Sequence, residues 1–185
     1  MEYFYELRIP KDRVAVLIGK KGETKEKLEE NTSCQIRVNS KEGEVFLKGK
    51  DALQLYSARQ MVTAIGRGFN PEVALLLLNT DYVFEVIDIT IFSKKSKDTL
   101  IRLKGRVIGK EGKSRRIIEE LSECHISIYG KTISMIGSSD TVGIARQAIE
   151  SLLKGSTHAN VYKFLEKRRR EFKRSRIIGK NIELK

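Results

Sequence analysis

The sequence predicts an α+β fold made of two similar domains, residues 1–79 and 80–185, each a three-stranded antiparallel sheet with helices packed on one face. Three observations lead to this prediction. The chain repeats itself, both copies show the same order of strand and helix patterns, and a Gly-x-x-Gly loop stands at the same point in each. With 40% apolar and 32% charged residues over 185 positions, the chain can build two modest cores.

The repeat becomes visible when Gly19 is aligned with Gly109. Ile18-Gly19-Lys20-Lys21-Gly22 then falls on Ile108-Gly109-Lys110-Glu111-Gly112, and Cys34-x-Ile36-x-Val38 falls on Cys124-x-Ile126-x-Ile128. Because so many matches at one offset do not arise by chance, the chain contains two copies of one fold. The two cysteines stand at matching points, which predicts repeated buried thiols rather than a disulfide.

In the first copy, alternating residues from Tyr3 to Ile9 predict a half-buried strand that ends at Pro10. A short helix over 11–18 follows, with Asp12 as its expected cap. The remaining predicted elements are a helix over 23–31, strands over 35–39 and 44–48, a helix from an Asp51 cap to about Gly66, and an apolar helix over 71–78. We expect residues 75–78 of this last helix to pack between the two halves of the chain.

The second copy opens with a predicted strand over 82–92, a basic turn over 93–97, and a helix that Asp98 caps and that ends near Leu103. Residues 104–108 lead into the second Gly loop. A helix over 113–122, strands over 125–129 and 132–136, and a helix over 140–153 follow. An added helix over 159–173 is expected to pack on the domain through Val161, Phe164, Leu165 and Phe172, and we expect the polar end from Arg174 to Lys185 to be mobile.

Charge is distributed unevenly along the chain. Residues 1–92 carry 13 Lys/Arg and 14 Asp/Glu, whereas residues 93–185 carry 23 and 10, so the whole net charge of +12 comes from the second half. This excess points to an anionic partner, with nucleic acid as the first candidate. No apolar run approaches the roughly 20 residues that a membrane span needs, the first ten residues do not resemble a signal peptide, and we expect a cytoplasmic protein without a membrane partner.

The Gly-x-x-Gly loops have a geometry suited to phosphate. Gly109 and Gly112 carry no Cβ, so the loop can approach another backbone closely, and either glycine can adopt a positive φ. The loop also presents the free N–H groups of the first turn of the next helix. Because Lys110 and Lys113 add positive charge beside these groups, a phosphodiester backbone suits the loop well.

At these loops, together with the following helix and the Ile126-x-Ile128 strand, the sequence resembles the K-homology (KH) domain in its type I arrangement. The resemblance implies that the loop clamps about four nucleotides of single-stranded RNA, with the bases on an apolar groove floor. Carried over residue by residue, the clamp is Gly109, Lys110, Glu111 and Gly112. The groove would be lined by Val107, Ile108, Ile118, Ile126 and Ile128, phosphates would meet Arg106, Lys113, Arg115 and Arg116, and an auxiliary RNA site would comprise Ile18, Gly19, Lys20, Lys21 and Gly22.

The sequence resembles the archaeal relatives of the ribosome-assembly factor called partner of the Nob endonuclease more closely than it resembles KH domains at large. The features that support this resemblance are the two KH copies, the run GRVIGKEGKSRRIIEE and the final helix at Val161-Tyr162. This resemblance implies binding near the 3′ end of small-subunit ribosomal RNA during maturation, with the endonuclease and other ribosome-assembly proteins as partners. Two departures stand out: Lys25 and Arg115 replace a residue that is usually apolar, and the first Gly-x-x-Gly is retained, unlike in the eukaryotic relatives.

The two copies differ in charge after the loop. Residues 23–30 carry two Lys and four Glu, whereas residues 113–120 carry three Lys/Arg and two Glu. Because Glu23 and Glu26 would repel the phosphates that Lys113 and Arg115 attract, we predict that the second copy is the main RNA site. The first copy is then auxiliary or a protein-docking surface. The run Lys167 to Arg170 is either a solvated helix face or an additional contact with RNA backbone.

Two other classes of function compete with RNA binding as interpretations of the sequence. Gly112-Lys113-Ser114 matches the last three positions of a nucleotide-binding P-loop. The motif also requires a glycine five positions before Gly112, and Val107 stands there, so the match is incomplete. With two His and two Cys, no catalytic site, metal site or cofactor is expected, and His125 is expected to have no special role. A KH protein acting on other RNA, in translation or decay, and a protein scaffold with weak RNA binding remain as alternatives.

Overall fold

The computed structural model describes residues 2–93 and 96–183, the last eight of them as backbone alone. The first unit contains β1 (Tyr3–Arg8), α1 (Lys11–Ile18), η1 (Lys20–Gly22), α2 (Glu23–Thr32), β2 (Gln35–Asn39), β3 (Glu44–Gly49), α3 (Ala52–Gly66), α4 (Pro71–Ala74) and η2 (Leu75–Leu78). The second contains β4 (Tyr82–Asp88), α5 (Thr90–Ser93), α6 (Lys97–Ile108), η3 (Lys110–Gly112), α7 (Lys113–Ser122), β5 (His125–Tyr129), β6 (Thr132–Ser138), α8 (Ser139–Leu153) and α9 (His158–Glu183).

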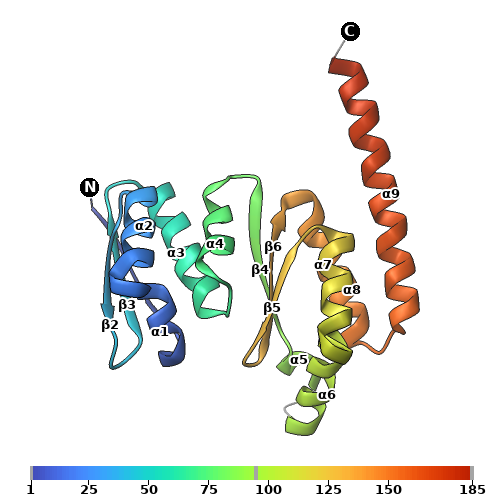
Figure 1. Ribbon diagram of the computed structural model, residues 1–185, viewed down its shortest axis with the longest axis horizontal. Helices are drawn as coiled ribbons and strands as arrows, with labels where there is room; N and C mark the ends of the chain where they lie inside the picture. Colours follow the sequence, from blue (N-terminus) through green and yellow to red (C-terminus); the bar gives the residue numbers. More distant parts are fainter. Residues whose placement is uncertain (1, 94–95, 184–185) are drawn as a thin grey trace.

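Each unit is built on a three-stranded antiparallel sheet, in the order β1-β3-β2 in the first and β4-β6-β5 in the second. The helices of each unit cover one face of that unit's own sheet, and Figure 1 shows sheet and helix layers alternating along the molecule. The predicted α+β class and the twofold repetition are therefore confirmed. In both units the Gly loop lies between two helices and leads, through the second helix, to an edge strand.

The second sheet packs against the helices of the first unit. The rings of Phe69 and Phe84 meet edge to face, with centroids 6.3 Å apart, and Ile136 is fully buried in the core of the first unit. Leu77 is buried in the same core, and its neighbours over 75–78 are partly buried there beside Phe84. The expectation that residues 75–78 pack between the two halves is confirmed.

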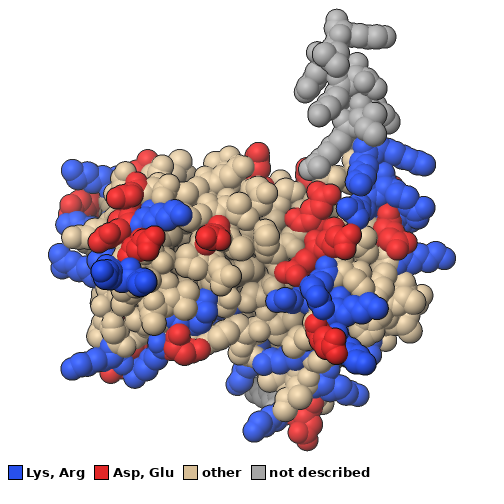
Figure 2. Space-filling view, viewed as in Figure 1, with Lys and Arg blue, Asp and Glu red and all other residues tan. Residues whose placement is uncertain are grey.

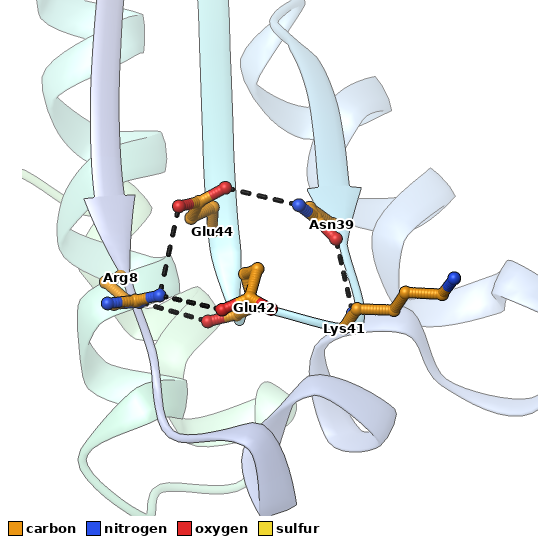
Figure 3. A network of polar contacts seen from close by, with 5 residues as sticks. All are labelled: Arg8, Asn39, Lys41, Glu42 and Glu44. Atoms are coloured by element: carbon orange, nitrogen blue, oxygen red, sulfur yellow. Dashed lines mark hydrogen bonds and ion pairs between the residues drawn. The ribbon is translucent and has the colours of Figure 1, made fainter.

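Charged side chains at one end of the first sheet neutralise one another. Arg8 donates to the backbone carbonyl of Glu42 at 3.0 Å and pairs with the Glu42 and Glu44 carboxylates at 3.1 and 3.9 Å. Asn39 donates to Glu44 and accepts from the Lys41 N–H, which closes the turn between β2 and β3 (Figure 3). This end of the first unit presents paired charges rather than an excess of one sign.

The start of the second unit differs from the prediction. The strand predicted over 82–92 ends at Asp88, because the Asp88 carboxylate accepts hydrogen bonds from both the N–H and the hydroxyl of Thr90, at 2.8 and 2.6 Å. This local turn starts the short helix α5. The predicted basic turn over 93–97 includes residues 94–95, which lie outside the described residues.

Helix caps and helix ends also differ from the prediction. Ser96, not Asp98, caps α6 by accepting the Thr99 N–H, and α6 continues beyond Leu103 to Ile108. Asp12 does not cap α1; its carboxylate accepts the hydroxyl of Tyr129 from the second unit, which also raises the pKa of Tyr129. Helix α9 runs on to Glu183, ten residues beyond the end predicted at residue 173.

The two thiols are repeated core positions, as predicted. Cys34 and Cys124 are buried and unpaired. Each lies against a glycine of the middle strand: a Cβ on Gly49 would lie 2.9 Å from the Cys34 Sγ, and one on Gly137 would lie 2.4 Å from the Cys124 Sγ. In both units, therefore, the cysteine side chain fits only because the residue opposite it on the middle strand is a glycine.

Candidate nucleic-acid interface

The second Gly loop is a tight turn that depends on glycine. Gly109 has φ 73° and ψ 176°, a conformation that essentially only glycine adopts, and Gly112 has φ 75°. A Cβ on Gly109 would lie 2.6 Å from the Ser114 Cβ, whereas one on Gly112 would meet nothing within 4 Å. Helix α7 therefore begins directly against the loop, and the outer end of the loop is open.

The open end of the loop can attract an anion. No side chain of the described residues caps α7 at Gly112, so its first N–H groups face outward without a side-chain acceptor. Lys110 and Lys113 are exposed beside them, and the first turn of α7 contains no acidic residue. Arg116 donates to the Glu111 carbonyl at 2.9 Å and braces the loop, in which Glu111 has a φ of 53°. The geometry fits a phosphate group at the start of α7.

The predicted groove residues divide into two groups. Val107 and Ile118 are fully buried, and Ile126 is 3% exposed, so these three belong to the core of the second unit. Ile108 is 37% exposed and Ile128 is partly buried, so these two can meet a ligand. That RNA contacts these five residues stays a prediction, and Ile108 and Ile128 offer the most exposed surface among them.

Arg106 has a structural role that the sequence did not indicate. Its Nε donates to the Leu152 carbonyl at 3.1 Å and its Nη2 donates to the Ser156 carbonyl at 2.6 Å, which ties α6 to the end of α8. Two N–H groups of the Arg106 guanidinium are therefore engaged within the unit, and its predicted contact with phosphate stays a prediction. Arg13 binds the Ile65 and Phe69 carbonyls of the first unit in the same way.

Arg115 belongs to a linked set of contacts beside the edge strand β5. Its Nε lies 3.7 Å from the Glu119 Oε2, and the Glu119 Oε1 accepts the Ile126 N–H at 2.8 Å. Sequence reasoning missed Glu119, although its signal was present: a basic residue and a Glu four positions later occur in both copies. Arg115 is thus held on the side of α7 that carries this link to β5.

The first Gly loop has nearly the same backbone as the second. Gly19, Lys21 and Gly22 have φ values of 76°, 56° and 91°, against 73°, 53° and 75° for their counterparts. The chemistry around the loop differs, because the first turn of α2 carries Glu23 and Glu26. Both loops can therefore form the turn, but only the second is followed by a helix start free of acidic residues.

Comparison with known proteins agrees with this geometry. A family model for the KH domain matches residues 4–64, and a second, described as a eukaryotic type KH-domain (KH-domain type I) and built on the second KH domain of PNO1, matches residues 83–170. The chain is 50% identical to a KH domain-containing protein of Methanocaldococcus jannaschii, covering 92% of this chain and 76% of that one. It is 34% identical to the RNA-binding protein pno1 of Dictyostelium discoideum, covering 87% and 70%. The chain belongs to the PNO1/Dim2 family of two-KH-domain proteins.

Solved PNO1/Dim2 structures share the arrangement of both units. Dim2p from Pyrococcus horikoshii superposes with a TM-score of 0.83 at 44% identity, over 89% of this chain and 99% of that one. The Dim2 chain in a complex of a/eIF2alpha, aDim2p and rRNA from the same organism gives 0.86 at 44% identity, over 92% and 96%. The predicted resemblance to the archaeal PNO1/Dim2 family is therefore confirmed.

Two structural features of this PNO1/Dim2 protein bear on other functions. Within residues 2–93 and 96–183, no three His, Cys, Asp or Glu side chains come together in a way that could hold a metal ion. No helix in that same part of the chain is both long enough and apolar enough to cross a bilayer.

Proposed function

We propose that this protein holds single-stranded RNA near the 3′ end of small-subunit ribosomal RNA during ribosome maturation, mainly through its second KH domain and without catalysing a reaction. Membership of the PNO1/Dim2 family supports a role in ribosomal RNA processing. The aDim2p of Pyrococcus horikoshii has been solved together with rRNA, and this chain matches it over both units.

The observation that carries the proposal is that two loops of equal shape are followed by helix starts of different charge. The backbone of the first loop matches that of the second, yet Glu23 and Glu26 stand where an incoming phosphate would approach α2. In the second unit, Lys113 and Arg116 stand at the corresponding positions, and both are exposed. Since phosphate contacts dominate affinity for nucleic acid, this difference favours the second loop.

The proposal includes protein partners. The Pyrococcus complex also contains a/eIF2alpha, so the corresponding protein is one candidate neighbour. The family resemblance adds the Nob-type endonuclease and other ribosome-assembly proteins, in the cytoplasm. In this arrangement the protein positions the RNA, and the chemical step belongs to its neighbour.

A pair of matched variants tests the asymmetry. Lys110→Asp and Lys20→Asp make the same charge change at equivalent loop positions, and their affinities for RNA from the 3′ end of small-subunit rRNA can be compared by fluorescence anisotropy. We expect Lys110→Asp to weaken binding by about tenfold or more, and Lys20→Asp by about threefold or less. Equal losses would contradict the dominance of the second domain. Absence of wild-type binding even at low salt would favour a protein scaffold.

A further inference from the structure

Helix α9 is attached to the second unit at its beginning and projects from the body at its end (Figure 1). Val161 and Leu165 are buried in the second core, at 3% and 0% exposure. The His158 Nε2 lies 2.8 Å from the Arg106 carbonyl, three residues before Gly109. The helix therefore starts beside the segment that leads into the second Gly loop.

The structure divides the basic residues of α9 into two groups. Arg168 pairs with Glu171 at 3.2 Å and lies over the Phe164 ring, and Arg169 lies 3.9 Å from a Glu120 carboxylate oxygen. These two arginines are engaged within the protein. Half of the Lys167 to Arg170 run is therefore explained by structural contacts.

The second group forms one stripe along the helix. Lys163, Lys167, Arg170 and Arg174 are spaced four, three and four residues apart, so they share one face, and all four are exposed. None of them pairs with a carboxylate among the described side chains; the Arg170 Nε contacts the Glu166 carbonyl at 3.4 Å. We call these four residues the cationic stripe, and Figure 2 shows Lys and Arg gathered on this part of the molecule.

The cationic stripe does not stabilise helix α9 itself. Like charges four residues apart destabilise a helix by a few tenths of a kcal/mol per pair, and the stripe contains two such pairs. Over residues 158–175, seven Lys/Arg face two Glu, Glu166 and Glu171, and Glu171 is already paired with Arg168. A bound polyanion would neutralise these charges and so remove the repulsion. Release of the counterions of the polyanion would add to the binding free energy.

We propose that the cationic stripe binds the phosphodiester backbone of RNA outside the short segment held by the Gly109–Gly112 loop. This inference rests on the proposed function, because the stripe belongs to the same unit as the loop and begins close to it. A membrane surface fits less well, because the apolar residues of α9 are used for packing on the protein. The stripe would add affinity without reading the base sequence.

The test uses two RNAs and two triple variants of the whole chain. One RNA is a segment of about sixteen nucleotides from the 3′ end of small-subunit rRNA, and the other is the tetranucleotide within it that binds best, since one KH groove holds about four nucleotides. The stripe variant is Lys163→Gln, Lys167→Gln and Arg170→Gln. The control is Lys11→Gln, Lys41→Gln and Lys50→Gln, which removes the same charge from exposed positions of the first unit.

The stripe variant should bind the long RNA about tenfold or more weakly than the control variant does. Its plot of log affinity against log salt should be shallower by about 2, because each lost phosphate contact removes about 0.7 from the slope. Its affinity for the tetranucleotide should equal that of the control, and circular dichroism should show unchanged helix content. Equal affinities and slopes of the two variants for the long RNA would overturn the inference and leave the proposed function standing. Failure of the wild type to bind either RNA would overturn both.

Discussion

The carboxylate of Glu119 accepts a hydrogen bond from the backbone N–H of Ile126 at 2.8 Å, and so joins helix α7 to the edge strand β5. The first unit repeats this bond between Glu29 and Ile36 at 2.6 Å. In each unit the carboxylate also lies near a basic residue one turn earlier on the helix. The link holds the helix that follows each Gly loop at a set distance from its edge strand.

Replacement of Glu119 by Ala should destabilise the second unit. The change leaves the partly buried Ile126 N–H without its acceptor, which costs about 1–3 kcal/mol. Urea denaturation measures the loss of unfolding free energy. Glu30→Ala is the control, because Glu30 is an exposed helix residue with no hydrogen bond or ion pair given by the structure, and its effect should stay within about 0.5 kcal/mol. Equal effects of the two variants would show that the Glu119 bond contributes nothing.

Arg106→Lys should reduce stability more than RNA affinity. Lysine keeps the positive charge but cannot bind the Leu152 and Ser156 carbonyls together as the guanidinium does. We expect a loss of about 1–3 kcal/mol in unfolding free energy, with RNA affinity of the folded protein within about twofold of wild type. A variant that folds as stably as wild type but binds RNA tenfold more weakly would instead support Arg106 as a phosphate contact.

The two glycines of the second loop should respond differently to alanine. Gly109→Ala places a Cβ 2.6 Å from the Ser114 Cβ in addition to straining the backbone, whereas Gly112→Ala only strains it. A left-handed residue costs about 1–2 kcal/mol for a side chain other than glycine. Thermal or urea unfolding should therefore show a clearly larger loss for Gly109→Ala. The reverse order would mean that the loop relaxes away from Ser114.

The stability supplied by Cys124 should decline at alkaline pH. Burial raises the pKa of this thiol above its ordinary value of 9.0, so the folded protein keeps it protonated. The contribution is complete below the unfolded pKa and is lost as pH rises through the folded pKa, because the unfolded chain ionises first. The difference in unfolding free energy between wild type and Cys124→Ala should thus be smaller at about pH 10 than at about pH 7. A constant difference would contradict this account.

Sequence periodicity was sufficient for the repeated parts of the fold. The loop from Gly109 to Gly112 and the helix and strand after it are local patterns, so residues 109–129 could be assigned before the structure was known. The end of β4 could not be predicted in this way. The Asp88 carboxylate accepts two hydrogen bonds from Thr90, and these bonds favour a turn over continuation of the strand. Alternation of apolar residues carries no information about that competition.

The surroundings of the second Gly loop were predicted only in part, because they depend on contacts between residues far apart in the sequence. Arg13 and Arg106 make equivalent bonds to helix ends, but they stand one helical turn apart when the repeats are aligned, so the alignment hides the similarity. Burial of Val107 depends on the packing of α6 against the rest of the unit, which a motif does not specify. The motif therefore located the loop correctly and could not separate core residues from exposed ones.

The central claim is that unpaired RNA lies in the groove beside the second Gly loop. The most direct measurement is photo-crosslinking of the wild-type protein to 4-thiouridine-substituted RNA from the 3′ end of small-subunit rRNA, with crosslinked peptides located by mass spectrometry. The account predicts crosslinks within residues 107–113 and 126–128, and their loss on Lys110→Asp. Crosslinks confined to the first unit, with residues 107–113 unmodified, would contradict it.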